Sequence, residues 1–476
     1  MAGRVVKGVS WSAIQQFSTQ IVQFVVAIII AKLLTPSEFG VVAASMIVLT
    51  ILQVVNETGF GAALMQKLDR DETDFFSVFI LNVAMGIVLY LFIVFTAHLW
   101  ASVFKTPQLE TVIKFLGLNL IINSFVVVQR TKLFINVDFK TYTKASVAAA
   151  IVSGGIGIFM AYNGFGVYAL VAQSLIMSLL STLLIWLMVK WIPNGPFSFK
   201  RIKSLFNYAY KLILARLINT VFNEIFASVI AVVFNPAQLA LYNRSNSFLS
   251  MTSSNVVQIV QRVSIPLMCE KQNSESELRD ILLKFISNTA LIILPLITLL
   301  FVLARPLILC LLNENWIGCI GILQIISISG IFYSISAFNM NIFNATGRTD
   351  LALRCEVFKK VISICIIAVA VVFKNFDALI WSCTITALVE CFINVKYTYS
   401  QVHTSFWTQM KEIYKTTFCA FVMGIIVYAG TLLVSNIYIQ LFVLGAIGVI
   451  IYAMLCFIFN VNNIRYTACQ ILNSAR

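Results

Sequence analysis

Fourteen apolar stretches follow one another along the chain, and each has the roughly 20 residues needed to cross about 30 Å of hydrocarbon. They cover residues 11–34, 40–64, 75–100, 111–129, 145–162, 166–189, 207–234, 238–261, 285–304, 316–343, 357–373, 377–395, 416–435 and 437–459. Only 11% of the 476 residues are charged, against about 25% in a soluble domain. This composition excludes soluble and disordered chains and predicts an all-α polytopic membrane protein with about 14 transmembrane helices.

The basic residues predict the orientation of these helices, because Lys and Arg beside a span resist translocation. With the N-terminus inside, most Lys and Arg residues fall in inner segments, including Arg465 and Arg476 after the last span. The outer segments hold only Lys32, Lys105, Lys114, Arg305 and Lys374. We therefore expect both termini to be cytoplasmic, and the net charge of +14 to reflect topology rather than a nucleic-acid partner.

The first twelve spans contain a weak internal repeat. Residues 35–41 align with 235–241, 79–82 with 285–288, and 134–136 with 342–344, at an offset that drifts slowly. An even number of spans in each copy predicts two parallel six-helix bundles of the MATE/MOP-like kind, followed by two C-terminal helices. The expected domains are an N-lobe at 1–204, a C-lobe at 205–400, and two further spans with a cytoplasmic C-terminus at 401–476.

Two related bundles with short outer loops suggest a cleft that opens alternately to each side. Polar residues at helical spacing in the eighth span would face it: Asn243, Ser247, Ser250, Ser254, Gln258 and Gln261. Gln16 and Gln23 form part of a shorter stripe in the first span. The alternative for both stripes is hydrogen bonding between packed helices.

Ionisable side chains inside a span are costly, so each one is a candidate functional group. Arg216 lies near the middle of the seventh span, where a guanidinium suits an anionic substrate, and Lys211 is a supporting cation. Glu224 and Arg244 reach similar depths on adjacent predicted helices. They are candidates for ion coupling and substrate binding respectively, or form a structural salt bridge with each other.

Other polar residues allow fewer roles. Glu57 and Glu390 lie about two turns from the inner ends of their spans and either titrate in ion coupling or stabilise a helix end. Asp138 belongs to an inner loop and is expected either to cap a helix or to form a salt bridge in the loop. The sequence has no Walker loop and no metal-ligand cluster, so we expect neither ATP hydrolysis nor a cofactor.

Several short motifs resemble those of the bacterial polysaccharide exporters of the MOP flippase superfamily. They occur at residues 8–11, 34–40, 57–64, 134–140, 241–244 and 345–350, in the order that the family keeps. The closest resemblance is to the Wzx-like and colanic-acid-exporter-like branch. Such proteins have fourteen helices in two lobes and a cationic central cavity, and the resemblance places Arg216 and Arg244 in that cavity.

The resemblance implies a non-enzymatic flippase of the bacterial inner membrane. Its substrate would be an undecaprenyl-pyrophosphate-linked oligosaccharide, moved to the outer leaflet for O-antigen, capsule or exopolysaccharide synthesis. Polymerase and chain-length proteins are the candidate protein partners. Two alternatives stay open: cation-coupled export of small molecules, which favours acidic cavity residues, and an enzyme of glycan assembly, which the short outer loops disfavour.

Overall fold

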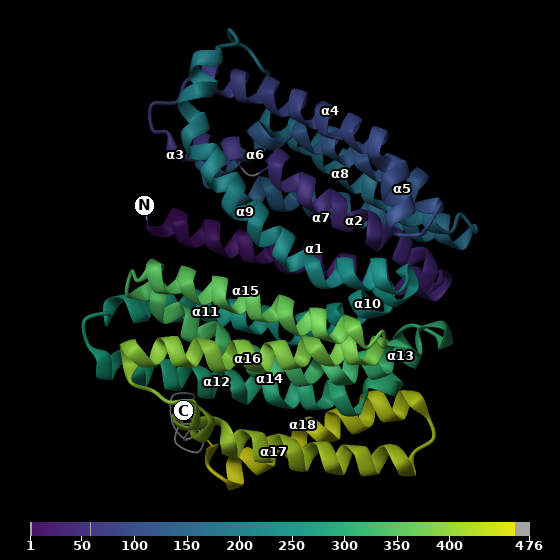
Figure 1. The fold of residues 1–476 in the computed structure, drawn as a ribbon, viewed down its shortest axis with the longest axis vertical. Coiled ribbons are helices and arrows are strands. Elements are labelled where there is room, and N and C mark those ends of the chain that lie inside the picture. Colours follow the sequence, from purple (N-terminus) through teal and green to yellow (C-terminus); the bar gives the residue numbers. More distant parts are fainter. Residues whose placement is uncertain (1, 58, 462–476) are drawn as a thin grey trace. The chain divides into compact units, whose positions relative to one another are not determined.

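The computed structural model describes residues 2–57 and 59–461, and these residues form helices and no strand (Figure 1). The first nine helices are α1 (Ala2–Leu33), α2 (Pro36–Glu57), α3 (Gly59–Gln66), α4 (Glu72–Val103), α5 (Gln108–Ser124), α6 (Val127–Ile135), α7 (Phe139–Tyr162), α8 (Val167–Val189) and α9 (Phe199–Val233). The predicted all-α class is confirmed for the part of the chain that is described. The predicted inner residues Arg465 and Arg476 lie outside it.

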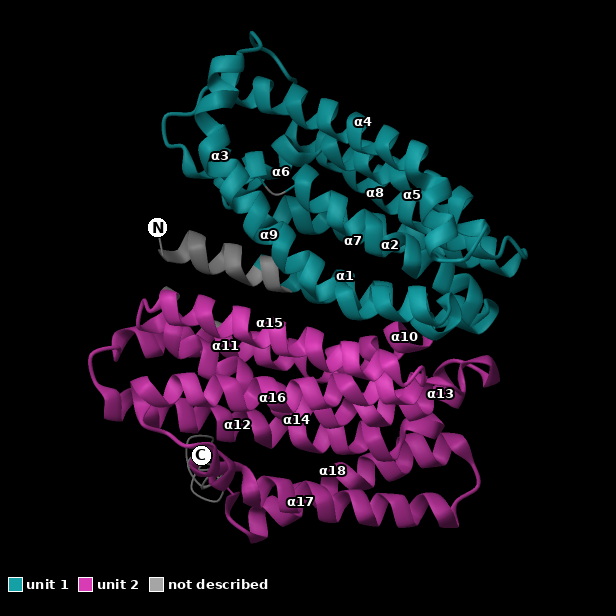
Figure 2. Cartoon of the chain, in the orientation of Figure 1, with its two compact units in different colours: residues 1–240 teal, residues 241–476 magenta. Residues whose placement is uncertain are grey.

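The chain divides into two compact units, residues 1–240 and 241–476 (Figure 2). Helix α10 (Pro236–Thr252) runs across the division. The second unit continues with α11 (Ser254–Glu270), α12 (Glu275–Val302), α13 (Ala304–Leu311), the 3₁₀ turn η1 (Glu314–Trp316), α14 (Cys319–Ala345), α15 (Thr349–Val372), α16 (Phe376–Val402), α17 (Phe406–Leu433), the π-helical segment η2 (Ile439–Leu444) and α18 (Gly445–Ile458). The predicted boundary at residues 204/205 concerns the sequence repeat, whereas the boundary between the compact units lies at residues 240/241, after α9. The predicted boundary therefore stays a prediction.

Eleven of the described helices are long and apolar enough to cross a membrane. A twelfth span is formed if α5 and α6, which meet at a bend of 44°, are counted together. The more polar helices α10, α11 and α15 occupy the remaining predicted spans at 238–261 and 357–373. The helices are therefore consistent with fourteen spans, and that number stays a prediction.

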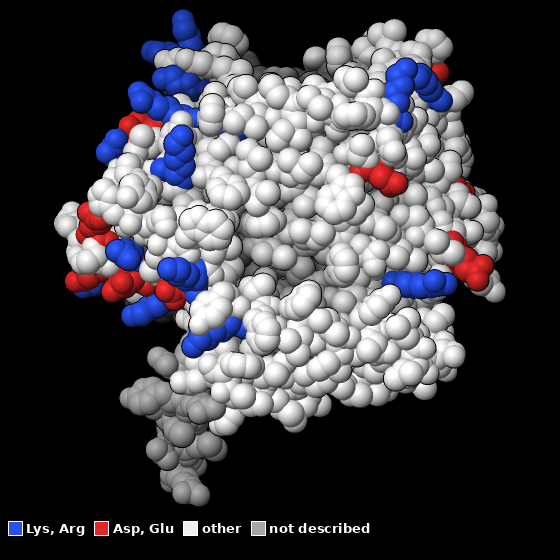
Figure 3. Space-filling model, turned by 60° about the horizontal axis from the view of Figure 1, so that its bottom comes forward, with Lys and Arg blue, Asp and Glu red and all other residues white. Residues whose placement is uncertain are grey.

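The surface is apolar in the way that a lipid-facing surface must be. Phe95, Leu187, Val372 and Leu433 are each at least 71% exposed and are among many large apolar side chains at the surface. On the face shown in Figure 3 most of the surface is uncharged, and the charged side chains lie in a few groups. These features confirm a multi-pass membrane protein.

Each unit has its own interior. In the first unit α7 packs against α1 and α8, and α9 packs against α2, α3 and α4. In the second, α14 packs against α12 and α16, and α17 packs against α12. The buried amides of Asn339 and Gln409 exchange hydrogen bonds of 2.8 and 3.1 Å between α14 and α17. Because an amide in hydrocarbon needs such a partner, this pair fixes the register of the two helices.

The two Pro turns that align in the predicted repeat have the same local structure. The Thr35 hydroxyl donates to Glu38 and the Glu38 N–H lies 3.5 Å from the Thr35 oxygen, at the start of α2. At the start of α10 the Gln238 N–H donates to the Asn235 side chain at 2.8 Å. Pro36 and Pro236 each occupy the first helical position, where a missing N–H costs nothing. The match supports the predicted repeat.

Gly40 in α2 allows the closest backbone approach at these turns. A Cβ atom at Gly40 would lie 2.0 Å from the carbonyl oxygen of Pro236. We expect Gly40→Ala to lower the free energy of unfolding by about 3 kcal/mol, the upper range for overpacking, because backbone has to move. The control is Gly155→Ala in α7, where nothing lies within 4 Å of the new Cβ. Thermal unfolding in detergent checks the pair, and equal effects would contradict the prediction.

Candidate functional site

A pocket of about 240 Å³ lies within the first unit, between α3, α6 and α9 and beside the end of α2. It is lined by Glu57, Gly61, Ala62, Met65, Val127, Arg130, Thr131, Phe134 and Arg216. Three of these side chains are ionisable: one carboxylate from α2 and one guanidinium each from α6 and α9. The pocket lining therefore has an excess of positive charge.

Local geometry brings the three ionisable residues together. The bend of 44° between α5 and α6 turns the second helix, so that Arg130 faces the pocket. Helix α3 lies close to α9, since a Cβ atom at Gly59 would lie 2.4 Å from the Ile213 side chain. Ile213 is three residues before Arg216, so this close packing places Arg216 at the pocket wall.

The pocket lining contains an ion pair between Arg130 and Glu57 and a second guanidinium, that of Arg216. The Nη1 atom of Arg130 donates to Oε2 of Glu57 at 3.1 Å, and the two side chains are 25% and 27% exposed. Arg216 is exposed and lines the same pocket. A guanidinium binds phosphate oxygens in pairs, so an anionic headgroup entering the pocket would meet Arg216 and compete with Glu57 for Arg130.

We expect Glu57 and Arg130 to be energetically coupled. Glu57→Gln and Arg130→Gln should each lower stability, and the double variant should be more stable than the sum of the two losses predicts. We expect a coupling free energy of about 1 kcal/mol, because the pair is partly exposed to solvent. Thermal unfolding of the four proteins in detergent measures it; purely additive losses would show that the ion pair contributes nothing.

The other predicted residues of α9 lie outside this pocket's lining. Lys211 is exposed, and Glu224, farther along the helix, is half-buried. The lining includes neither of them. Glu224 belongs to the first unit and Arg244 to the second, so the pairing of these two residues stays a prediction, as do the substrate role of Lys211 and the coupling role of Glu224.

In the second unit Arg244 is part of a packed interior. Its side chain is 8% exposed, and its guanidinium lies 5.6 Å from the ring centre of Trp316, itself fully buried. This cation–π contact gives Arg244 a structural role. Its predicted part in substrate binding remains untested.

The polar stripe of the eighth span is divided by a break at Ser253, between α10 and α11. The Ser247 hydroxyl donates to the Asn243 carbonyl at 2.8 Å, within its own helix. Gln261 contacts the Asn341 amide of α14 at 3.3 Å, which is the helix-packing alternative. Ser250 and Ser254 are half-buried and Gln258 is exposed. The wet-cavity interpretation of the stripe stays a prediction.

The remaining predicted residues are also separate from the pocket. Gln16 and Gln23 are exposed on α1, seven residues apart and hence on one face. Glu390 accepts a hydrogen bond of 3.0 Å from Ser363 and so joins α16 to α15. Asp138 accepts from the Thr141 N–H at 3.1 Å at the start of α7, which confirms its predicted capping role.

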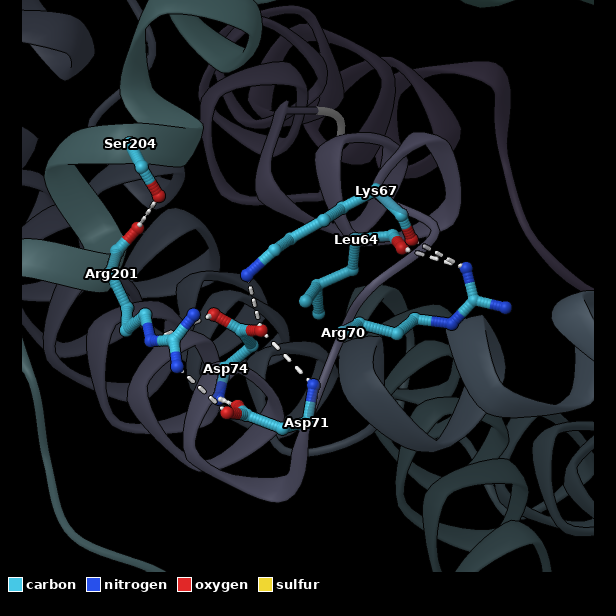
Figure 4. Close-up of polar contacts among 7 residues, drawn as sticks. All are labelled: Leu64, Lys67, Arg70, Asp71, Asp74, Arg201 and Ser204. Atoms are coloured by element: carbon cyan, nitrogen blue, oxygen red, sulfur yellow. Dashed lines mark hydrogen bonds and ion pairs between the residues drawn. The ribbon is translucent and has the colours of Figure 1, made fainter.

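A second group of charges anchors the beginning of α9. Lys67, Asp71, Asp74 and Arg201, here called the α3–α4 charge cluster, contact one another in Figure 4. Asp74 is fully buried; its carboxylate lies 2.6 Å from Lys67 and 3.9 Å from Arg201. Arg201 also contacts Asp71 at 2.9 Å. The cluster therefore ties α9, which carries Arg216, to the start of α4.

The α3–α4 charge cluster contributes less to stability in acid. The pKa of Asp71 is lowered, first by the hydrogen bond from the Asp74 N–H and also by the charge of Arg201, while burial acts in the opposite direction. Asp71 thus releases its proton more readily in the folded chain than in the unfolded chain. Its contribution to stability is present above its unfolded pKa and is lost as the pH falls through its lowered folded pKa.

Sequence reasoning missed the role of Arg130. Arg130 lies directly after the apolar run at 111–129, so the pattern of spans and basic residues indicates only an inner segment there. The signal that was present is the polar sequence Gln129, Arg130, Thr131 and Lys132, which continues as a helix in α6. The bend that turns this short helix into the bundle was not visible in the hydropathy pattern.

Comparisons with known proteins agree with this architecture. The model of the polysaccharide biosynthesis protein family matches residues 29–321. The chain is 23% identical to the teichuronic acid biosynthesis protein TuaB of Bacillus subtilis, over 73% of each chain. It is 22% identical to the succinoglycan biosynthesis transport protein ExoT of Rhizobium meliloti, over 81% of this chain and 78% of the relative.

A solved structure has the same fold. The lipid II flippase MurJ, in an inward closed conformation, superimposes with a TM-score of 0.77 at 16% identity, covering 96% of this chain and all of that one. The resemblance inferred from the sequence motifs is thereby confirmed at the level of family and fold. Because the family model covers more than half of its length, the chain belongs to the polysaccharide biosynthesis protein family.

Proposed function

We propose that this protein flips an undecaprenyl-pyrophosphate-linked oligosaccharide repeat unit from the cytoplasmic to the outer leaflet by alternating access, for surface polysaccharide synthesis. The observation that carries the proposal is the pocket that holds both Arg130 and Arg216 within the membrane-spanning helices. Because Glu57 offsets only one of the two guanidinium groups, the site keeps a positive charge that is costly in an apolar bundle without a further anion. A pyrophosphate supplies the matching charge.

Arg216, Arg130 and Glu57 have different parts in binding and releasing the pyrophosphate. Arg216, which is exposed, makes the first contact with the pyrophosphate oxygens. Arg130 is held by Glu57 at 3.1 Å until the headgroup displaces the carboxylate. Glu57 then takes the guanidinium back when the headgroup leaves, so the empty pocket never holds an unpaired Arg130. This exchange keeps the electrostatic cost of the empty and loaded states similar, as repeated cycling requires.

The function is tested in a strain that lacks the gene. Lipid-linked oligosaccharide is extracted, and its sidedness is measured with a membrane-impermeant glycan-modifying enzyme applied to intact spheroplasts. We expect the intermediate to accumulate in a form that the enzyme cannot reach and surface polymer to be lost; the complemented strain is the control. Normal intermediates and normal polymer, together with new sensitivity to cationic drugs, would overturn the proposal in favour of small-molecule export.

The proposed location is the bacterial inner membrane with both termini in the cytoplasm. The gathering of Lys and Arg in alternate connections supports it. Single cysteines introduced into a variant without native cysteines would be labelled by an impermeant thiol reagent at the 163–165 turn and protected at residues 67–71. The opposite pattern would reverse the orientation.

A further inference from the structure

Helices α15 and α16 of the second unit have two hollows along the seam between them. The first, of about 500 Å³, lies near the turn that joins the helices and has an almost wholly apolar lining that includes Val369, Phe373 and Trp381. The second, of about 380 Å³, lies toward the other end of the hairpin and is lined by Phe358, Ile393, Lys396, Tyr397 and Ser400. Neither hollow belongs to the pocket described above.

The two hollows lie on one face of the hairpin. Phe358, Cys365, Val369 and Phe373 follow one another on α15 at steps of 7, 4 and 4 residues, which is one side of a helix. On α16, Trp381, Ile385 and Lys396 are separated by 4 and 11 residues and also share a side. The hollows are thus two parts of one seam, here called the hairpin groove.

The length of the hairpin groove limits what can fill it. Trp381 and Lys396 are fifteen residues apart on α16, which corresponds to about 22 Å of helix. One leaflet supplies only about 15 Å of hydrocarbon, half of the membrane core. The acyl chain of an ordinary phospholipid ends near the midplane, so it cannot fill both hollows. A longer chain can.

Charge distinguishes the two ends of the hairpin groove. At one end Lys396 lines the hollow, and Arg354 is exposed one turn beyond Phe358 on the same side of α15. At the other end Lys374 has the acidic Asp377 three residues away. The neighbouring Lys359 is paired with Glu356 and adds no net charge. An anionic headgroup therefore has one favoured end.

We infer that the hairpin groove binds the lipid part of a polyprenyl phosphate, with the phosphate at Lys396 and Arg354 and the isoprenoid chain extending past Trp381. This inference rests on the proposed function, because a polyprenyl carrier is the lipid that such a substrate contains. It goes beyond that function by giving the chain its own binding surface in the second unit. With its phosphate at Lys396 and Arg354, the carrier lipid is bound there separately from the pocket of Arg130 and Arg216 in the first unit.

Binding of undecaprenyl phosphate to the purified full-length protein, followed by native mass spectrometry, tests the inference. Ala378→Trp fills the first hollow, and we expect it to raise the Kd of undecaprenyl phosphate about tenfold, the loss of a few buried methylenes. Farnesyl phosphate is too short to reach that hollow, so it should bind the wild type and Ala378→Trp equally.

Lys396→Gln tests the other end of the hairpin groove. It should weaken the binding of both lipids by about three- to tenfold through the lost charge. Ile447→Trp, on the exposed side of α18, is the control.

The possible results separate the interpretations. If Ala378→Trp folds poorly, as judged by its melting temperature, Trp381→Ala replaces it and should weaken undecaprenyl phosphate selectively. Equal Kd values for every variant would overturn the inference, as would displacement of undecaprenyl phosphate by equimolar phosphatidylglycerol. If the variants do not alter binding of undecaprenyl phosphate but intermediates are trapped in the deletion strain, only the inference about the hairpin groove is wrong. If binding behaves as expected but no intermediates are trapped, only the proposed flipping function is wrong.

Discussion

Arg216→Ala will abolish surface polysaccharide while leaving the amount of protein in the membrane unchanged. Arg216 is exposed at the pocket wall, so its truncation leaves the interior of the first unit intact. The lost contact is a charge-assisted one, worth about 1.5–3 kcal/mol, or roughly 10- to 150-fold in binding. Polymer is measured by quantitative glycan staining of whole cells, and protein by immunoblotting of the membrane fraction.

Two further variants sharpen this test. Arg216→Lys keeps the charge but loses the planar fork, so it should restore only part of the polymer. Lys203→Ala, an exposed cation near the start of the same helix, is the matched control and should behave as wild type. Normal polymer output from Arg216→Ala would show that the pocket is not the headgroup site. Loss of polymer from Lys203→Ala as well would point to a general effect of charge on α9.

Asp74→Ala will lower stability more than any other single change to a charged residue considered above. Its carboxylate is fully buried and neutralises Lys67 at 2.6 Å, with Arg201 at 3.9 Å. Removing it takes away the ion-pair partner of Lys67, whose side chain is only 14% exposed, and leaves Arg201 with Asp71 alone, which costs about 3–5 kcal/mol. It also removes the acceptor for the Asp71 N–H in the capping box of α4. Thermal unfolding of the purified protein in detergent measures the loss.

An exposed ion pair provides the comparison. Lys271 and Glu277 lie 2.7 Å apart, and both side chains are 50% exposed. Glu277→Ala should therefore change stability by less than about 1 kcal/mol. If Asp74→Ala were equally mild, the α3–α4 charge cluster would not anchor α9. A loss of stability accompanied by a loss of polymer would link the anchor to the position of Arg216.

Helix positions followed directly from the apolar runs, because hydrocarbon allows a chain to cross only with its backbone bonds satisfied inside each segment. The Pro turns before α2 and α10 and the Asp138 cap of α7 were equally visible, since each depends on residues close in sequence. Short-range chemistry of this kind is independent of tertiary packing. The all-α class could therefore be predicted from the sequence, whereas the family was indicated by the resemblance of its motifs.

Only part of the candidate pocket could be identified from the sequence. Arg216 and Glu57 were identified because a charge inside an apolar run stands out, but the third member, Arg130, sits seventy-three residues after Glu57 and is joined to it by folding alone. The same reasoning makes Arg244 a substrate-binding residue or a salt-bridge partner of Glu224, and the structure adds its packing on Trp316; both roles stay predictions. Hydropathy finds buried charges without revealing their partners.

The packing of α9 has a consequence for how the chain is made. By the predicted repeat α9 begins the second copy, yet its contacts are with α2, α3 and α4 in the first unit. During synthesis the first unit is complete only after residue 233 has entered the membrane, so the two copies cannot fold as successive independent modules. Coexpressed fragments divided in the turn after α9 should assemble. A division at 204/205 would separate most of α9 from α2, α3 and α4, against which it packs, so these fragments should assemble less well.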